Sequence, residues 1–279
     1  MKVVNNISYE TEIVFMSDIK VGLVLSGGGA LGMAHVGVLK ALIENGISPN
    51  IVVGTSIGSL VGGVYSAGVP LENIEKEALS ISTKQLFDVN LNVRGLLSGK
   101  SAIKLIKNIL GQDYMIEDLK VKYGAVAVDI MAAKEELFTS GSLLDAIRAS
   151  ISVPGVFIPH KIGEKYYVDG GILNNLPENY ALDMGADYVI SVNLMYGYKP
   201  RAIPKTAIHS VVYTSFIMQN EITNMRPKLS NVRIDLNLNG FKQHIFNKTS
   251  AEKLIKIGYD ETKKQIDKIK KDIAKIKKP

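Results

Sequence analysis

Ser56 stands between two glycines in GTSIG, residues 54–58, a segment with the G-x-S-x-G pattern that often marks a catalytic serine. A serine hydroxyl is a weak nucleophile unless a neighbouring base accepts its proton. The apolar run before Ser56 predicts a strand and the small-residue run after it predicts a helix, which is the context of a nucleophile elbow. Gly54 and Gly58 allow the backbone to pass closely around such a turn. The segment therefore predicts nucleophilic catalysis by Ser56 and requires a base elsewhere in the chain.

A glycine-rich loop, SGGGALG, precedes this serine, and its Gly27, Gly29 and Gly32 have the G-x-G-x-x-G spacing of a dinucleotide-binding turn. A dinucleotide site also needs an acidic residue at the end of the second strand, and NIVVGTS contains none. The loop is better suited to an oxyanion hole, built from the N–H groups of Gly27, Gly28 and Gly29 together with that of Ile57. A tight turn without a ligand is the alternative, although three consecutive glycines exceed what such a turn demands.

Four histidines are candidates for the base, and none has a compelling setting. The order Ser, acid, His of an α/β-hydrolase is compatible with His209 and His244. His209 lies within a helical pattern, however, and His244 lies near the basic end of the chain. His35 follows the glycine loop by one helical turn, where packing or a local hydrogen bond explains it, and His160 lies in a loop.

Asp169 in YYVDGG is the other candidate base, at the end of a predicted short strand. An ordinary aspartate has a pKa near 3.9 and is a poor base, but a dry site without a strong cationic partner raises its proton affinity. Gly170 and Gly171 leave room around the carboxylate, so that Asp169 could accept the Ser56 proton directly. The alternative is a structural D-G-G turn.

Four blocks in order, GGGALG, GTSIG, ASISVPGVF and DGG, resemble the patatin-like phospholipase family, particularly its small bacterial members. The resemblance covers about residues 20–195. It implies a three-layer α/β/α fold and a Ser–Asp dyad without a catalytic histidine, with Ser56 as nucleophile and Asp169 as base. Gly28 and Gly29 would be the main oxyanion donors. Family members often carry a basic residue in the glycine loop, where this chain has Ala30 and Leu31.

The resemblance further implies hydrolysis of fatty-acyl esters of phospholipids, lysophospholipids or simpler lipids, with neither metal nor organic cofactor. Two other classes stay open: a Ser-His-Asp esterase of the α/β-hydrolase type, and a non-catalytic lipid-binding module. The acyl chains need an apolar groove, for which two segments are candidates. They are 86–97, with Leu86, Phe87, Leu91, Leu96 and Leu97, and 208–225, with Ile208, Val211, Phe216 and Ile222. Both segments could equally face the core.

The elements that would position these residues alternate along the chain. Strands are predicted at 20–26, 49–56, 123–131, 165–171, 187–195 and 231–238, and helices at 33–46, 57–69, 141–153, 177–186, 203–225 and from 250 onward. Residues 72–118 are predicted to be mostly helical, with a polar interruption. Because the strands are apolar on both faces, we expect a mainly parallel sheet with helices on both sides. We predict one domain over 1–279, with the motifs in about 20–195 and a closing region at about 204–279.

Composition excludes several other classes. With 279 residues, 46% hydrophobic and 22% charged, the chain is an ordinary globular protein with a large core. The absence of cysteine excludes disulfides and thiolate metal sites, and the scattered histidines argue against a zinc site. Two uncharged stretches, 21–39 and 45–71, are long enough to span a bilayer, but their glycines and turn signals favour buried strand-turn-helix units. The N-terminus lacks a signal-peptide pattern, so we expect a cytoplasmic protein.

The net charge of +6 is concentrated at the C-terminal end, where ten lysines and four acidic residues follow from Lys253 onward. Nucleic acid and an anionic membrane surface are the specific partners that such charge suggests. A solvated helix face is the simpler interpretation, and we expect no nucleic-acid partner. Peripheral contact of this lysine-rich end with an anionic membrane remains a hypothesis, and the oligomeric state is left open.

Overall fold

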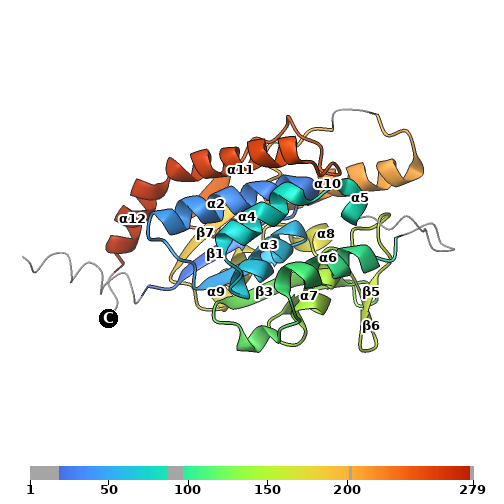
Figure 1. The fold of residues 1–279 in the computed structure, drawn as a ribbon, viewed down its shortest axis with the longest axis horizontal. Helices are drawn as coiled ribbons and strands as arrows, with labels where there is room; N and C mark the ends of the chain where they lie inside the picture. Colours follow the sequence, from blue (N-terminus) through green and yellow to red (C-terminus); the bar gives the residue numbers. More distant parts are fainter. Residues whose placement is uncertain (1–18, 87–96, 201–202, 277–279) are drawn as a thin grey trace, which may run out of the picture.

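A central sheet of eight strands forms the middle of the protein, for which a computed structural model describes residues 19–86, 97–200 and 203–276 (Figure 1). The strands are β1 (Val21–Leu25), β2 (Ile51–Thr55), β3 (Lys122–Asp129), β4 (Lys134–Phe138), β5 (His160–Ile162), β6 (Lys165–Asp169), β7 (Tyr188–Asn193) and β8 (Val232–Asp235). Hydrogen-bonded neighbours follow one another in the sequence β5-β6-β3-β2-β1-β7-β8, and β4 also pairs with β3. The five strands from β3 to β8 in this order are parallel, whereas β4, β5 and β6 pair antiparallel. The predicted mainly parallel sheet is therefore confirmed.

Helices cover both faces of this sheet. They are α2 (Met33–Glu44), α3 (Ile57–Ser66), α4 (Leu71–Ser80), α5 (Thr83–Leu86), α6 (Lys100–Leu110), α7 (Leu143–Ser150), α8 (Gly171–Asn174), α9 (Glu178–Asp183), α10 (Ala207–Met225), α11 (Lys248–Lys263) and α12 (Ile266–Ala274). Short 3-10 turns, η1 (Gly29–Gly32) and η2 (Ile116–Asp118), precede α2 and β3. The order strand, helix, strand, helix predicted for the first half is confirmed.

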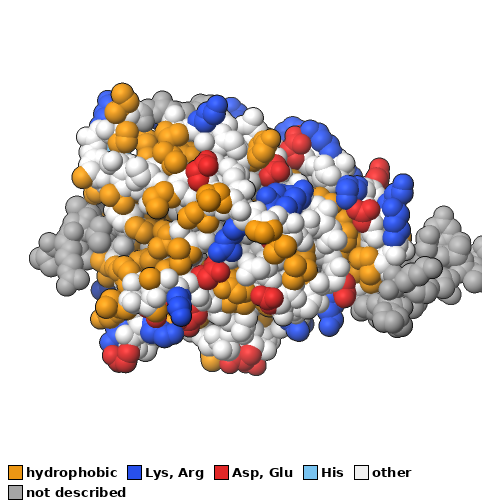
Figure 2. Space-filling view, turned by 180° about the vertical axis from the view of Figure 1, so that it is seen from behind, with side chains coloured by type: hydrophobic (Ala, Val, Ile, Leu, Met, Phe, Trp, Pro, Cys, Tyr) orange, Lys and Arg blue, Asp and Glu red, His pale blue; other side chains and the backbone are white. Residues whose placement is uncertain are grey.

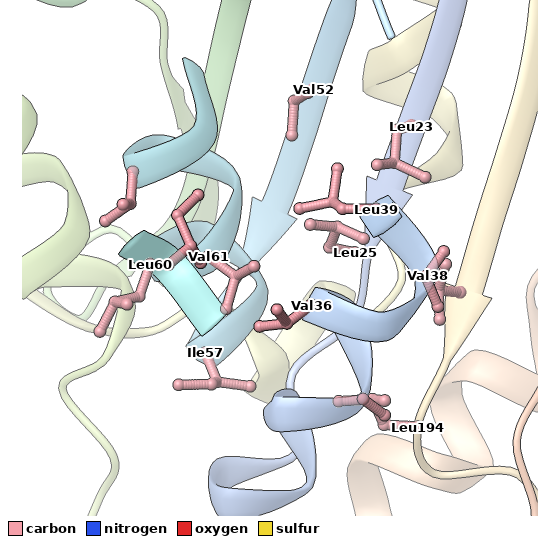
Figure 3. Packing of buried hydrophobic residues seen from close by; sticks show 14 of the residues in the cluster. Leu23, Leu25, Val36, Val38, Leu39, Val52, Ile57, Leu60, Val61 and Leu194 are labelled. Atoms are coloured by element: carbon pink, nitrogen blue, oxygen red, sulfur yellow. The ribbon is translucent and has the colours of Figure 1, made fainter. Parts of the chain in front are cut away.

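Alternation along the strands divides the interior into two layers, because adjacent side chains of a strand point to opposite faces. Leu23 and Leu25 of β1 belong to a large core that also contains residues of α2, α3 and α11. Figure 3 shows Leu25 within this core together with Leu39 of α2. Val24 belongs instead to a smaller core with Ala181 of α9. The result is the expected three-layer α/β/α arrangement.

The C-terminal helices close the large core. α11 packs on α2 at van der Waals range, since a Cβ on Gly37 would overlap the backbone of Ile255 and one on Gly258 would overlap that of Ala34. Ile266, Ile269 and Ile273 of α12 are buried. Of the lysines between them, Lys268 forms an ion pair with Asp272 of the same helix. Lys256 and Asp260 form a similar pair on α11.

Residues 72–118 contain α4, α5 and α6, in agreement with the mostly helical prediction, and most of the predicted interruption lies outside the described residues. Two strands differ from the expectation. The strands β4 and β5 were not predicted, because their half-buried polar residues lack an apolar run. The two long uncharged stretches are divided between β1, α2, β2 and α3. Across the described residues, none of the helices combines the length and apolar character needed to cross a membrane.

Candidate active site

Ser56 lies in a tight turn between β2 and α3, as the pattern predicted. Its φ of 54° and ψ of −126° are rare for a residue with a side chain, and such strain typically costs about 1–3 kcal/mol. A Cβ on Gly54 would overlap the backbone of Gly58, and one on Gly58 would overlap the carbonyl group of Leu25. Both flanking glycines are therefore required by close backbone approach, which allows the turn to form beneath the Ser56 side chain.

Ser150, at the end of α7, fixes this turn from the side. The Ser56 N–H donates a hydrogen bond of 2.8 Å to the Ser150 hydroxyl, which donates in turn to the Val126 carbonyl at 2.6 Å. Ser150 is completely buried, so that these bonds are shielded from water. Sequence reasoning gave Ser150 no role, although it lies within the ASISVPGVF block.

Asp169 is brought to Ser56 by the pairing of β3. β4 and β6 both pair with residues 127–129 of β3, and β4 and β2 both pair with Ala125 and Val126. Since each edge of a strand pairs with one neighbour at a time, β2 and β6 must share the same edge of β3. Thr55 is opposite Val126, and Asp169 is opposite the next residue, Ala127. β6 thus occupies the edge that β2 leaves when the chain turns away at Ser56.

The Asp169 carboxylate is almost completely buried, with 2% of the residue exposed. Burial raises its pKa to about 6, while hydrogen bonds from the Ser56 side chain and from the Gly171 N–H lower it in part. The Gly171 bond is 2.8 Å long, and the Asp169 N–H donates to the Ser152 carbonyl at 3.0 Å. The carboxylate is therefore held in one orientation beside Ser56 and has an unusually high proton affinity for an aspartate.

The glycine loop approaches Ser56 from the other side, but its N–H groups differ in availability. The Gly27 N–H donates to the Asn175 carbonyl at 3.2 Å, so it is not free to bind an oxyanion in this structure. Within the part of the chain that is described, the N–H groups of Gly28, Gly29 and Ile57 have no protein acceptor. Gly29 adopts a φ of 58°, which favours glycine. The proposed oxyanion hole is accordingly limited to Gly28, Gly29 and Ile57.

The remaining motif glycines are sites of close packing. A Cβ on Gly32 would overlap the Ile57 side chain, and one on Gly170 would overlap the Val126 carbonyl. A Cβ on Gly171 would lie 2.8 Å from Asn175 Oδ1. Asn175 is buried, and its side-chain amide has no partner among the described residues. It therefore lies between the glycine loop and the turn that follows Asp169.

No hydrogen bond in the described parts of the chain joins a histidine to Ser56. His35 Nε2 bonds to the Ser26 carbonyl at 2.9 Å, and burial lowers its pKa to about 4, so this histidine is a neutral packing residue as expected. His160 bonds to Asp145. His209 and His244 stack on each other with ring centroids 6.2 Å apart.

An apolar pocket opens beside Ser56, with about 1080 Å³ of empty space including its mouth. Ser56 and Gly29 lie at its wall, and Gln243 and His244 border it. The other walls come from α2, α3, α4, α6, α10 and the segment after α7. Among their residues are Met33, Val36, Ile57, Leu60, Val61, Val64, Ile74, Ala78, Ala102, Ile109, Val153, Val212 and Phe216. Figure 3 shows Ile57, Leu60 and Val61 following one another along α3. Such a lining suits a hydrocarbon chain.

The two segments predicted as groove walls contribute unequally. Phe216 lines the pocket, whereas Ile208 and Val211 are exposed and Ile222 is not part of the lining. This differs from the prediction because α10 turns only its Val212 and Phe216 side toward the pocket. Of the other segment, Phe87, Leu91 and Leu96 lie outside the described residues, as does the Leu86 side chain. Leu97 bonds to the backbone of Val156 and Ile158 and is not part of the lining.

The protein has a three-layer α/β/α fold, with a serine at a strand-to-helix elbow and an aspartate and a glycine loop beside it. This combination of fold and site is typical of one protein family. The chain belongs to the patatin-like phospholipase family. A family profile described as "Patatin-like phospholipase" matches residues 23–182, which contain Ser56, Asp169 and the glycine loop.

Similar proteins include an uncharacterized NTE family protein of Mycobacterium tuberculosis, 39% identical over 178 residues that cover 63% of this chain and 49% of that protein. The Neuropathy target esterase sws of Drosophila melanogaster is 36% identical over 62% of this chain, and Patatin-like phospholipase domain-containing protein 7 of Rattus norvegicus is 37% identical over 62%. The match spans 13% of each of these two proteins. The chain therefore spans half or less of the length of these relatives.

Among solved structures, VipD from Legionella pneumophila matches with a TM-score of 0.49 and 13% sequence identity, over 90% of this chain and 67% of that chain.

Proposed function

We propose that this protein is a serine lipid acyl hydrolase that cleaves fatty-acyl esters of phospholipids, lysophospholipids or related lipids through a Ser–Asp dyad. The observation that carries the proposal is the meeting of three features at one point. A strained serine lies beside a buried aspartate whose pKa is raised to about 6, and the serine borders an apolar pocket. The family membership and the names of two relatives, an esterase and a phospholipase domain-containing protein, support the same chemistry.

The proposed reaction uses Asp169 as the base. Asp169 accepts the Ser56 proton as Oγ attacks the ester carbonyl carbon, and the N–H groups of Gly28, Gly29 and Ile57 bind the oxyanion. When the tetrahedral intermediate collapses, the alcohol leaves with the proton from Asp169, and the acyl group remains on Ser56. Water then attacks the acyl-enzyme and gives a proton to Asp169, which returns it to Ser56 as the fatty acid departs. The pocket holds the acyl chain throughout.

Labelling with a fluorophosphonate probe tests the nucleophile. The probe should modify the wild-type protein at Ser56 and leave Ser56→Ala unmodified. Labelling that survives in Ser56→Ala, or that maps by mass spectrometry to another residue, would contradict the assignment.

The base is tested by comparing Asp169→Asn with variants of the histidines, each assayed with a soluble neutral ester. Asp169→Asn should lower kcat by about a thousandfold or more, because no other group accepts the Ser56 proton. His209→Gln and His244→Gln should retain measurable turnover. A loss in either histidine variant as large as that of Asp169→Asn, with an intact fold, would favour the Ser-His-Asp alternative. A wild-type protein without any ester hydrolysis would favour a non-catalytic lipid-binding module.

Peripheral membrane contact is a further part of the proposal. α10, whose Val212 and Phe216 line the pocket, also exposes apolar side chains, including Ile208, Val211, Met218 and Met225. Figure 2 shows hydrophobic side chains gathered at the end of the molecule where α10 lies. The lysine-rich C-terminal helices supply positive charge that anionic lipids attract. Sedimentation with anionic but not zwitterionic vesicles, reversed by salt, tests this contact.

A further inference from the structure

A second pocket lies beside the apolar one and differs from it in charge. It has about 810 Å³ of empty space including its mouth. We call it the basic pocket and define it by the residues that line it: Tyr198, Lys199, Ile203, Lys205, His209, Tyr213, Asn239, Phe241, Lys242, Gln243 and His244. Gln243 and His244 also line the apolar pocket, so the two cavities share a wall.

That shared wall touches the glycine loop. The Ala30 N–H donates to the Gln243 carbonyl at 2.7 Å, and a Cβ on Gly29 would overlap this carbonyl. Gln243 is thus in contact with the loop that is proposed to bind the oxyanion. A substrate with its ester at Ser56 and its acyl chain in the apolar pocket would direct its alcohol portion past Gln243 and His244.

The basic pocket is positively charged. Lys199, Lys205 and Lys242 are exposed, and within the residues that the structure describes none of them forms an ion pair and no acidic side chain lines the pocket. Burial, with His209 and Lys242 nearby, lowers the pKa of His244. The glycine loop itself carries no cation, because Ala30 and Leu31 occupy its centre.

The N-terminal end of α10 adds to this potential. α10 has 19 residues and begins at Ala207, and its cap residue Thr206 accepts a hydrogen bond from the His209 N–H at 3.2 Å. His209 therefore belongs to the first turn of the helix, where the helix dipole is positive and attracts anions. Tyr198 and Tyr213 provide hydroxyl groups in the same pocket.

We propose that the basic pocket binds the phosphate of the substrate, so that the ester cleaved at Ser56 belongs to an acyl lipid with a phosphate-bearing head group. This inference rests on the proposed hydrolase function for its chemistry, but the binding of phosphate can be measured without turnover. Three ammonium groups without an ion-pair partner among the described residues, together with a helix N-terminus, match a phosphate dianion or diester. Phosphate is the charged group next to the ester in phospholipids and lysophospholipids. The apolar pocket then holds the hydrocarbon part of the substrate, and the basic pocket holds its anionic part.

Binding in the Ser56→Ala background tests the inference, with two soluble ligands that differ only in phosphate: hexanoyl-glycerol phosphate and monohexanoylglycerol. Calorimetry should give tighter binding of the phosphate ligand. Lys205→Gln and Lys242→Gln should each weaken that preference about three- to tenfold, and the double variant should weaken it by about 30-fold. Lys122→Gln is the matched control and should leave the preference intact. Lys122 is exposed at the first position of β3, outside the basic pocket. Ionic strength of about 1 M should reduce the preference as well.

An unchanged preference in the double lysine variant would overturn the inference, whatever the outcome of the hydrolysis assays. The hydrolysis assays separate the two proposals. If Ser56-dependent hydrolysis is absent while phosphate binding depends on the lysines, the hydrolase proposal fails and the phosphate site stands. If both esters are hydrolysed with a lysine-independent ratio of kcat/KM, the hydrolase proposal stands and the head-group assignment fails.

Inorganic phosphate distinguishes a head-group site from a site for the free ion. Phosphate should compete with hexanoyl-glycerol phosphate and leave the hydrolysis of monohexanoylglycerol unaffected. A change in the turnover of monohexanoylglycerol on addition of phosphate would indicate a regulatory site for the free ion and would overturn the head-group assignment.

Discussion

The backbone N–H of Ser56 donates a hydrogen bond of 2.8 Å to the hydroxyl of Ser150, and this bond connects the proposed nucleophile to the third strand of the sheet. The Ser150 hydroxyl in turn donates a hydrogen bond to the Val126 carbonyl, and the next residue, Ala127, pairs with Asp169. One buried hydroxyl thus fixes the elbow in relation to the strand that also positions the base. We regard Ser150 as a positioning residue rather than a reacting one.

Removing this hydroxyl should impair catalysis more than binding. In Ser150→Ala the Ser56 N–H loses its acceptor and the strained turn can relax away from Asp169. We expect kcat to fall by about tenfold to a hundredfold with KM little changed. Ser150→Cys, which keeps a weak donor and acceptor of similar shape, should recover part of the loss. Equal losses in both variants with a lowered Tm would indicate a packing role instead.

The raised pKa of Asp169 predicts the pH dependence of hydrolysis. The carboxylate must be deprotonated to accept the Ser56 proton, and its pKa is raised to about 6 by burial. With a neutral ester such as monohexanoylglycerol, kcat/KM should rise with pH and reach half its maximum near pH 6. A profile that is flat between pH 5 and 8 would argue against Asp169 as the base.

The same shift predicts that Asp169→Asn is more stable than wild type at neutral pH. A carboxyl group whose pKa is higher in the folded than in the unfolded state binds protons more tightly when folded. Stability is therefore lost as the pH rises from about 4 to about 6. Asn carries no charge to bury, so the variant should gain up to about 3 kcal/mol in the free energy of unfolding above pH 6.

Urea unfolding of both proteins across this range measures the gain. The difference between the two should disappear below about pH 4, where Asp169 is protonated in both states. A gain that persists undiminished at low pH would have another cause.

Filling the apolar pocket should change chain-length preference. Ile109 on α6 lines the pocket and is only partly buried, so a larger side chain can be accommodated without rebuilding the core. In Ile109→Trp we expect kcat/KM for a dodecanoyl ester to fall about tenfold relative to a butanoyl ester. Lys107→Gln, on the exposed side of the same helix, serves as the control. Equal changes for both chain lengths would place the acyl chain elsewhere.

A buried ion pair between Glu178 and Arg233 should stabilise the layer away from the proposed active site. Burial would raise the pKa of Glu178, but hydrogen bonds from Arg233, Ser191 and the Leu229 N–H outweigh it and hold the pKa below its usual range. Arg233→Met leaves this carboxylate without its cation, and we expect the free energy of unfolding at neutral pH to fall by about 3 kcal/mol.

An exposed pair provides the comparison for that experiment. Lys256 and Asp260 pair on the outside of α11, and Lys256→Met should change the free energy of unfolding by less than about 1 kcal/mol. Esterase activity of folded Arg233→Met should equal that of wild type. Similar stability of the two variants in urea would show that the buried pair has no special role.

Much of the fold and of the proposed site could be predicted from local patterns. The two glycines around Ser56 and the glycines before α2 lie in turns where the backbone packs closely. Because such packing requires glycine, these turns can be recognised in the sequence. The apolar runs that became β1, β2, β3 and β7 were equally clear, since strands buried on both faces have few polar residues. β4 and β5 were missed because half-buried antiparallel strands lack that signal.

The elbow at Ser56, the glycine loop and the short strand that ends at Asp169 follow from neighbouring residues, so local patterns were enough to predict them. The sharing of one edge of β3 by β2 and β6, which brings the serine and the aspartate together, arises only when the whole chain has folded. The tertiary structure also shows that the Gly27 N–H donates to the Asn175 carbonyl, and that residues within 198–199, 203–213 and 239–244 line one basic pocket. These relationships depend on how strands pair and how layers pack across the whole chain, and local residue patterns do not specify which strand edges pair.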